Sequence, residues 1–416
     1  MKFKTLNEWL SYLESIHPAE IDLGLERVAR VAQAMDLVRP ANKVLVVAGT
    51  NGKGSTVSYC DAILRENGLT VGCYISPHLH VYNERVLING EMVSDEDIVE
   101  SFHAIETARG QVTLTYFEFG TLSALYLFKK YGVDVAVLEV GLGGRLDAVN
   151  LVESDGAAVT SIGLDHVDWL GDDISVIAKE KAGVFRSCCP AVCGQVDVPA
   201  TLVDYAHSIG ANLMLKGVEF GVEQVEGRLN WFGLSAGERR KVDDLPMPSL
   251  PLENLPTALQ LVLSVWPDIT DDVIRAGVEK AHIAGRMQRF DQPYAGMVDV
   301  GHNPQAAALL ASQLPEVKGK KIALLAMLAD KDPDGVVSEL CSQVDEWWLC
   351  GLDGYRGQSV DELRSKITAD VARVKMFESV EAGLKHGLEV ASDQDFVIVL
   401  GSFITVAKAQ NWLKGY

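Results

Sequence analysis

The sequence predicts an α/β protein of two domains, in which a doubly wound domain on a mostly parallel sheet is followed by a smaller Rossmann-like α/β domain. The first reason is that short β-branched runs alternate with longer helical patterns. The second is that a further set of such runs follows residue 295. The third is length, because 416 residues exceed what one ordinary domain holds.

The first domain is expected to span residues 1–284. Its opening residues, 1–14, read as an amphipathic helix rather than a signal peptide. Helices are also predicted over 55–68, with Gly68 as C-cap, and from Ser94, where Asp97 completes a capping-box variant. Asn89–Gly90 predicts a type I′ hairpin that leaves the main sheet. The predicted buried strands cover 43–49, 70–76, 133–141 and 156–163.

The second domain is expected to span residues 297–416. Its predicted strands cover 295–301, 320–328, 344–352 and 395–403, and a helix is predicted over 304–314. The segment 285–296 contains Gly, Pro and Arg and breaks the helical pattern of 270–281, which favours a linker there. We therefore expect the active site in the cleft between the two domains.

Composition excludes several classes of protein. The chain has 37 Lys and Arg against 57 Asp and Glu, and a net charge of −20 argues against nucleic acid or an anionic membrane as partner. No apolar run approaches the roughly 20 residues that span a bilayer, so we expect a cytoplasmic protein. We also expect a monomer. The seven cysteines, including the cluster Cys188, Cys189 and Cys193, show no zinc-site spacing and are expected to be reduced thiols in or near the core.

The run VVAGTNGKGST at 46–56 predicts a phosphate-binding loop between a buried strand and a helix. A Gly-rich turn lets backbone N–H groups converge on an anion, Lys53 can reach the outer phosphates, and Ser55 or Thr56 can ligate magnesium. The pattern departs from the usual P-loop at Val47 and Gly54. The alternative is a turn that binds nothing, which the carboxyl-end position of the loop disfavours. The nucleotide-binding candidates here are Thr50, Asn51, Gly52, Lys53, Gly54, Ser55 and Thr56.

Two further residues follow predicted strands and could reach the same sheet edge. Glu139 ends the strand at 133–141, and His166 lies in the loop after 156–163. Magnesium prefers oxygen ligands, so Ser55 and Glu139 are natural candidates, whereas an imidazole is unusual for this ion. His166 could instead cap a turn beside Asp165. From the residues alone, Lys181 in AKEKAG can be interpreted as a solvated lysine paired with Glu180 or Glu153.

The motifs resemble a known family. GTNGKGS resembles the modified P-loop of the ATP-dependent amide ligases that comprise folylpolyglutamate synthases and muramyl-peptide ligases. SPHL at 76–79 with Arg85, EVGLGGRLDAVN at 139–150, GLDH at 163–166 and IAKEKAGVFR at 177–186 resemble the folate branch in order and spacing. AGRMQ, DVGHNP, MLADKD and GSFITV continue the match through the C-terminal half. The opening, EWLSYLESIHPAEIDLGLERV, is similar to bacterial enzymes that perform both dihydrofolate synthesis and folylpolyglutamate synthesis.

The resemblance implies a P-loop ATPase domain and a set of site residues. The implied metal ligands are Ser55, Glu139, His166 and Lys181, the last as a carbamate, and the implied catalytic residues are Lys53, Lys181 and His166. Asn254, Arg286, Asp299 and His302 match family positions that hold the nucleotide, although many relatives have His where Glu253 stands and Asn where Thr257 stands. The implied pterin-binding residues are Ile21, Leu23, Thr115, Phe117, Asp147 and Ala148, for which core packing is the alternative.

The reaction that the resemblance implies is the ligation of L-glutamate to dihydropteroate and to reduced folates through an acyl phosphate. ATP would be a substrate and Mg²⁺ a cofactor, with a monovalent cation as a further candidate. Three alternatives are a muramyl-peptide ligase, a plain kinase and a catalytically inactive nucleotide-binding regulator. The first is disfavoured because only residues 1–42 precede the P-loop strand, too few for an additional uridine-nucleotide domain, and the last because Lys53, Ser55, Glu139, His166 and Lys181 are all present.

Overall fold

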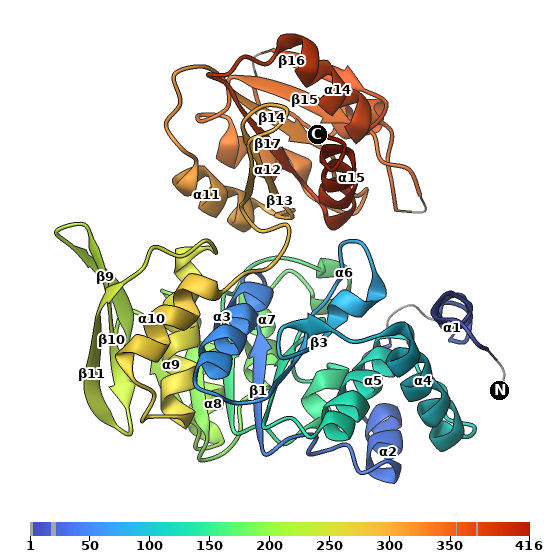
Figure 1. The fold of residues 1–416 in the computed structure, drawn as a ribbon, viewed down its shortest axis with the longest axis vertical. Helices are drawn as coiled ribbons and strands as arrows, with labels where there is room; N and C mark the ends of the chain where they lie inside the picture. Colours follow the sequence, from blue (N-terminus) through green and yellow to red (C-terminus); the bar gives the residue numbers. More distant parts are fainter. Residues whose placement is uncertain (1–2, 18–21, 355, 372) are drawn as a thin grey trace. The chain divides into compact units, whose positions relative to one another are not determined.

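The computed structural model describes residues 3–17, 22–354, 356–371 and 373–416. The chain divides into two compact units, Met1–His282 and Ile283–Tyr416, each built on its own sheet and core (Figure 1). Both units have the α/β architecture that the sequence predicts.

The first unit is organised by an eight-stranded sheet with the strand order β4-β3-β2-β5-β1-β6-β7-β8. From β2 to β8 neighbouring strands are parallel, while β3 and β4 form an antiparallel hairpin at one edge. The central strands are buried almost throughout, as expected where helices cover both faces of a parallel sheet. The strands are β1 (Lys43–Ala48), β2 (Val71–Tyr74), β3 (Val86–Ile88), β4 (Glu91–Met92), β5 (Val135–Glu139), β6 (Gly156–Val159), β7 (Pro190–Cys193) and β8 (Asn212–Leu215).

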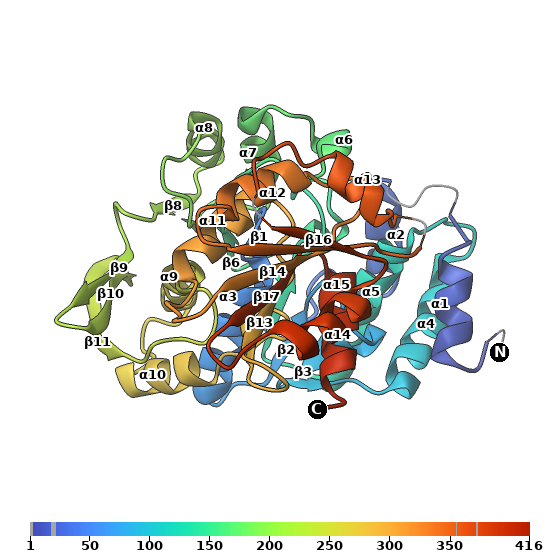
Figure 2. The same ribbon diagram turned by 90° about the horizontal axis from the view of Figure 1, so that it is seen from above.

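Helices pack on both faces of this sheet (Figure 2), and α1 lies beside α4. They are α1 (Leu6–Leu13), α2 (Glu26–Ala34), α3 (Lys53–Glu66), α4 (Asp95–Arg109), α5 (Tyr116–Tyr131), α6 (Val167–Leu170), α7 (Ile174–Ala182), α8 (Ala200–Ser208), α9 (Leu255–Val265) and α10 (Asp271–Lys280). Short 3₁₀ turns occupy η1 (Tyr82–Arg85), η2 (Ala148–Leu151) and η3 (Leu252–Asn254).

Local sequence signals explain several boundaries. Ser94 caps α4 by accepting a hydrogen bond from the N–H of Asp97, as predicted. Asn89 and Gly90 both have positive φ, +52° and +81°, which the hairpin turn requires. Helix α3 begins at Lys53 rather than at residue 55, because Gly52 adopts a left-handed conformation and serves as its N-cap.

A small antiparallel sheet in the same unit was not predicted. It consists of β9 (Gly221–Val225), β10 (Arg228–Ser235) and β11 (Glu238–Leu245), in the order β11-β10-β9 (Figure 1). Buried residues alternate along β10, and Trp231 is fully buried. The Gln260 side chain on α9 accepts from Leu234 N–H and donates to its carbonyl, which joins this sheet to the rest of the unit.

The second unit contains a six-stranded sheet with the order β12-β13-β17-β14-β15-β16. The segment predicted as a linker, 285–296, belongs instead to this unit, because β12 pairs antiparallel with β13. The strands are β12 (Gln288–Phe290), β13 (Gly296–Asp299), β14 (Lys321–Leu325), β15 (Glu346–Cys350), β16 (Val374–Phe377) and β17 (Phe396–Leu400). The helices are α11 (Pro304–Gln313), α12 (Pro333–Leu340), α13 (Val360–Ser365), α14 (Val380–Val390) and α15 (Phe403–Leu413).

The cysteines are free thiols, but not all of them are buried. Cys60, Cys73, Cys193 and Cys350 lie in the core, whereas Cys188 and Cys341 are exposed and Cys189 is half-buried, so the predicted core location is wrong for part of the set. None of the helices within the described ranges combines the length and the apolar run that crossing a bilayer requires.

Candidate functional site

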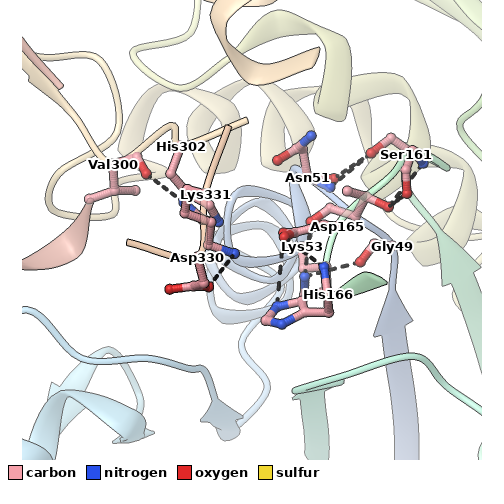
Figure 3. A network of polar contacts seen from close by, with 12 residues as sticks. Gly49, Asn51, Lys53, Ser161, Asp165, His166, Val300, His302, Asp330 and Lys331 are labelled. Atoms are coloured by element: carbon pink, nitrogen blue, oxygen red, sulfur yellow. Dashed lines mark hydrogen bonds and ion pairs between the residues drawn. The ribbon is translucent and has the colours of Figure 1, made fainter. Parts of the chain in front are cut away.

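The phosphate-loop candidate follows β1 at the carboxyl edge of the first sheet. Gly49 and Gly52 have φ of +149° and +86°, and a Cβ on Gly49 would lie 1.9 Å from Thr160 Oγ1. The loop is anchored to the segment after β6: Thr50 N–H donates to the Ser161 carbonyl at 2.8 Å, and Asn51 N–H donates to Ser161 Oγ at 2.9 Å (Figure 3). Glycine is therefore required at position 49 for packing as well as for backbone conformation.

Lys53 is the first residue of α3, and its side-chain ammonium lies against the phosphate loop. Its Nζ donates to the carbonyls of Gly49 and Thr50 at 3.0 and 3.1 Å (Figure 3). The N-terminus of a helix and a nearby ammonium both favour an anion at this place. Gly54 and Ser55 follow within the first turn and are buried. Thr56 Oγ1 donates to the Gly52 carbonyl at 2.9 Å, which favours Ser55 as the hydroxyl available to a ligand.

Glu139 lies at the same edge as the loop. It pairs in register with Val47 near the end of β1, and its side chain is buried. Its Oε2 accepts the N–H of Ser76, the second residue after β2, at 3.0 Å. A buried carboxylate and the buried hydroxyl of Ser55 are both hard oxygen donors, so the residues present suit a magnesium ion.

His166 sits one strand further along. It is the N-cap of α6 with φ +52°, its N–H donates to Asp165 Oδ1 at 2.9 Å, and its Nε2 lies 3.9 Å from Asp165 Oδ2 (Figure 3). The side chain is 38% exposed, unlike Glu139 and Ser55. The turn beside Asp165 that the sequence left open is thus present, and a ligand role for the exposed imidazole stays a prediction.

Lys181 on α7 is buried rather than solvated. Burial, together with the positive charge of Lys53, lowers its pKa to about 7, against the opposing effect of Asp165 and Asp147. The helix is held against the loop after β5, where Arg145 N–H donates to the Glu180 carbonyl at 2.9 Å and a Cβ on Gly144 would lie 3.0 Å from the Lys181 Cα. The ion pair predicted as an alternative for Lys181 is made by Arg145 with Glu180 instead.

Asp147 is the second group with a displaced pKa. Burial raises its pKa to about 7, although the N–H groups of Leu142 and Val149 donate to it at 2.8 and 2.9 Å and Lys53 lies close enough to act in the opposite direction. Two neighbouring groups, Asp147 and Lys181, therefore both titrate near neutral pH. Such clustering of displaced pKa values is typical of functional sites.

The predicted pterin residues divide into three groups. Thr115 is the buried N-cap of α5, and Phe117 in the first turn of this helix lies against the loop after β5, where a Cβ on Gly141 would be 2.5 Å from its ring. Ala148 is buried directly after Asp147. Leu23 is half-buried, and Ile21 lies outside the described residues. Phe117, the 141–148 loop and Asp147 are thus brought together.

Asn254, the last residue of η3 and the N-cap of α9, lies against the phosphate loop. A Cβ on Gly52 would lie 2.0 Å from the Asn254 Oδ1. Glu253, where many relatives have His, is ion-paired with Lys216, and Thr257 lies over Gly194, whose added Cβ would be 2.3 Å from its Oγ1. The structure therefore places Asn254 beside the loop in the first unit.

The remaining nucleotide candidates belong to the second unit. Asp299 ends β13 and accepts the N–H groups of Met287 and Gly301 at 2.9 and 2.7 Å. His302 Nδ1 lies 2.9 Å from the Val300 carbonyl (Figure 3), and Asn303 caps α11 ahead of Pro304. The Arg286 guanidinium lies over the Phe403 ring at 5.5 Å. These contacts give Asp299 and Asn303 a structural role in shaping this turn.

Two residues missed in the sequence analysis, Thr160 and Ser161, have hydroxyl groups that hydrogen-bond the backbone of the phosphate loop. Thr160 Oγ1 donates to the Asn51 carbonyl at 2.6 Å, and Ser161 Oγ donates to the same oxygen at 3.1 Å. The signal was available, because two small hydroxyl residues follow an apolar strand at the carboxyl edge where ligands bind in such sheets.

Comparison with known proteins defines the class first. Residues 47–201 match the Mur ligase middle domain, and residues 285–403 match the Mur ligase glutamate ligase domain. The chain therefore has the fold of a Mur-type ligase, and this family comprises ATP-dependent ligases.

The particular family follows from full-length similarity. The chain is 43% identical over 404 residues to the dihydrofolate synthase/folylpolyglutamate synthase of Escherichia coli (strain K12), covering 97% of this chain and 94% of that protein. The solved structure of E. coli FolC in complex with DHPP and ADP matches with a TM-score of 0.94 at 42% identity, covering 99% and 98% of the two chains. A Yersinia pestis enzyme complexed with AMPPNP and Mn ion matches with a TM-score of 0.93 at 46% identity, covering 100% and 99%. The chain belongs to the family of bifunctional dihydrofolate synthases/folylpolyglutamate synthases.

The SPHL segment gives a pH prediction. His78 Nδ1 accepts a hydrogen bond from Arg85 Nε at 2.9 Å, and burial together with Arg85 lowers the pKa of His78 from 6.5 to about 4. A group whose pKa is lower in the folded state favours unfolding once pH falls below its unfolded value. Between pH 6.5 and 4, the free energy of unfolding of wild type should therefore fall by about 1–2 kcal/mol more than that of His78→Gln, after discounting for partial exposure.

The matched control is His207→Gln in the last turn of α8. Parallel stability curves for wild type and His78→Gln across that pH window would show that the Arg85 contact does not hold the imidazole neutral.

Proposed function

We propose that this protein ligates L-glutamate to dihydropteroate, giving dihydrofolate, and to reduced folates, giving folylpolyglutamates, with ATP converted to ADP and phosphate. The observation that carries the proposal is the buried edge where Lys53, Lys181 and Asp147 meet the phosphate loop. Family membership and the ADP, DHPP and AMPPNP named for related structures support it. A muramyl-peptide ligase would share the middle domain, but the full-length similarity is to folate enzymes.

The chemistry must overcome the resistance of a carboxylate anion to attack by an amine. The γ-phosphoryl group of ATP moves to the acceptor carboxylate, forming an acyl phosphate, and the bridging oxygen leaves on ADP. The amine of glutamate then attacks the acyl carbon, loses a proton and expels phosphate. The N–H groups of Gly52 to Ser55 and the Lys53 ammonium hold the phosphates in position and spread their charge, so positioning and electrostatics supply most of the rate.

Divalent metal completes the proposal. Bound Mg²⁺ would neutralise charge on the transferring phosphoryl group. Ser55, Glu139, His166 and Lys181 are the residues proposed to hold it, while a monovalent cation stays a prediction. Among the described residues no three His, Cys, Asp or Glu side chains gather at a metal site, so the proposed ligand set depends on the hydroxyl of Ser55 and on modification of Lys181.

Carbamylation is the modification proposed for Lys181. Its lowered pKa leaves much of the amine uncharged near pH 7, and only the uncharged amine attacks carbon dioxide. The ammonium first loses one proton; a bond then forms between Nζ and the carbon of carbon dioxide, and a second proton is released. A cation thereby becomes an anion with two oxygens. That reversal of sign suits a residue that must bind a cation.

The acceptor is proposed to lie against Phe117, with Thr115, Asp147, Ala148 and Leu23 around the pterin. A flat heteroaromatic ring needs a stacking face and polar groups at its edge, and Phe117 and Asp147 supply one of each. Asn254 is proposed to bind the nucleotide beside the loop. Arg286, Asp299 and His302 keep their proposed nucleotide role on the strength of the family resemblance. A cytoplasmic location and a monomeric state also stay predictions.

The direct test is an ADP-release assay with ATP, magnesium, glutamate and either dihydropteroate or tetrahydrofolate. ADP release that requires both glutamate and an acceptor supports ligation. ADP release without glutamate would indicate a kinase, and no release with any acceptor would indicate the inactive regulator.

Lys53→Ala should lower ADP formation by at least about 10²- to 10³-fold, because it removes a charge that acts on the phosphates. The fold should persist, because Lys53 Nζ hydrogen-bonds two carbonyls of its own loop rather than a distant element of the core. The control is Lys43→Ala, at the opposite end of β1 and ion-paired with Asp155. Near wild-type turnover by Lys53→Ala would refute the phosphate-loop assignment.

Lys181→Ala should be inactive and should regain part of its activity when short carboxylic acids such as acetate occupy the vacated space. Lys179→Ala, an exposed residue on the same helix, serves as the control and should remain active. Mass spectrometry under native conditions should detect the carbamate on wild type. An unmodified Lys181 with full activity in carbon-dioxide-free buffer would contradict this assignment.

Acceptor use should be separable by mutation at Phe117 and Asp147. Dihydropteroate presents its benzoate carboxylate directly, whereas a folate presents a γ-carboxylate several bonds further from the ring. Since the reacting atoms must approach within about 3–3.5 Å in both cases, the two pterin rings cannot share one position. Phe117→Ala and Asp147→Ala should therefore lower kcat/KM for dihydropteroate more than for tetrahydrofolate, whereas Glu139→Ala and His166→Ala should lower both in parallel.

The measurement is kcat/KM for each acceptor across the four variants. If every variant lowered the two activities by the same factor, a single pterin position would have to replace the two-position scheme.

A further inference from the structure

Arg27 joins two segments that lie far apart in the sequence. It stands in the first turn of α2, directly after the loop that carries Leu23. Its guanidinium contacts Asp22 on that loop twice: Nη1 lies 2.6 Å from Asp22 Oδ2, and Nη2 donates to the Asp22 carbonyl at 3.0 Å. The same Nη2 donates to Glu118 Oε1 on α5 at 3.1 Å. One planar, always charged group therefore bridges the loop and the helix.

Glu118 carries this connection to the start of α5. Its side chain is only 4% exposed, so its charge requires a partner. While Oε1 accepts from Arg27, Oε2 accepts the N–H of Thr115 at 2.7 Å, and Thr115 Oγ1 in turn accepts the N–H of Glu118. This capping box fixes the first turn of α5, where Phe117 is located.

Phe117 completes the path to the proposed acceptor site. Its ring lies against Gly141, and the N–H of the adjacent Leu142 donates to Asp147 at 2.8 Å. A continuous set of contacts therefore links Asp22, Arg27, Glu118, Phe117 and Asp147. Leu23 stands at one end of this set and Asp147 at the other.

We propose that Arg27 is a positioning residue that selects for dihydropteroate, by holding the Leu23 loop at a fixed distance from the start of α5 so that both close on one pterin ring. The inference rests on the proposed function and deepens it, because Arg27 itself touches no substrate. Its effect is specific to one acceptor, since only a pterin lying between Leu23 and Phe117 depends on that distance. Binding of a folate whose ring lies elsewhere does not depend on the distance between Leu23 and Phe117.

Asp22→Asn is the cleanest test. Asp22 is 41% exposed, and its loss removes the charged tether to the loop while leaving the buried pair between Arg27 and Glu118 intact. Asp22 also lies 3.6 Å from His17 Nε2, a contact that the amide can keep. The matched control is Asp36→Asn, an exposed aspartate ion-paired with Lys129.

The expected result is a three- to fivefold loss in kcat/KM for dihydropteroate in Asp22→Asn, the scale of an exposed ion pair. KM for ATP, and kcat/KM for tetrahydrofolate, should stay within about twofold of wild type. Arg27→Lys should show a larger loss for dihydropteroate, because an ammonium cannot span both partners. Binding of dihydropteroate to the ADP-bound protein, measured by calorimetry, should weaken by the same factor as kcat/KM falls.

Equal losses for both acceptors, or no loss in Asp22→Asn despite wild-type use of dihydropteroate, would overturn the role of Arg27. If wild type never uses dihydropteroate but does ligate glutamate to tetrahydrofolate, the inference fails together with the bifunctional part of the proposed function. A wild type without any glutamate-dependent ADP release would instead refute the proposed function as a whole. A reduced unfolding midpoint in Arg27→Lys with unchanged acceptor preference would reduce Arg27 to a structural residue.

Discussion

The site depends on the burial of opposite charges at one edge of the first sheet. Burial alone would make Lys181 give up its proton and Asp147 keep one, and each pKa moves to about 7 for that reason. The carboxylates of Asp165 and Asp147 limit the downward shift of the Lys181 pKa. Backbone N–H groups and the charge of Lys53 limit the upward shift of the Asp147 pKa. Removing water from such a place strengthens every interaction with a phosphoryl group, and it also protects an acyl phosphate from hydrolysis.

The backbone arranges this edge before any side chain acts. The carboxyl ends of adjacent parallel strands lie at the same edge of a sheet. Strands β1, β5 and β6 therefore place the phosphate loop, Glu139 and the Thr160–Ser161 pair side by side at that edge. Gly49 and Gly52 then allow the loop to approach Thr160 and Asn254 more closely than any side chain would permit. The loop after β5 extends the same edge toward α7 through Arg145 and toward α5 through Phe117. The two proposed subsites, for phosphate and for pterin, are therefore parts of one continuous backbone feature.

Much of this could be predicted from the sequence, and the failures have physical causes. Strands buried on both faces leave long apolar runs, and phosphate loops leave glycines and a lysine, so both were found. The β9–β11 sheet was missed because its strands are charged on the outer face and depend on Trp231 and Gln260 for their inner contacts. Residues 288–290 were assigned to a linker because pairing with β13 leaves no signal in so short a run. The pKa of Lys181 and the bridge from Arg27 to Glu118, 91 residues away, depend on tertiary packing that spacing does not encode.

The central claim is that, at the site on this edge of the sheet, the γ-phosphoryl group of ATP is transferred to the acceptor carboxylate before glutamate reacts. Positional isotope exchange tests it most directly, using ATP labelled with oxygen-18 in the bridge between the β and γ phosphorus atoms. Reversible transfer to a bound carboxylate lets the β-phosphate of ADP rotate, which moves the label out of the bridge. The account predicts such scrambling with dihydropteroate in the complete absence of glutamate, and none without an acceptor. Scrambling that requires glutamate, or that proceeds with ATP alone, would contradict it.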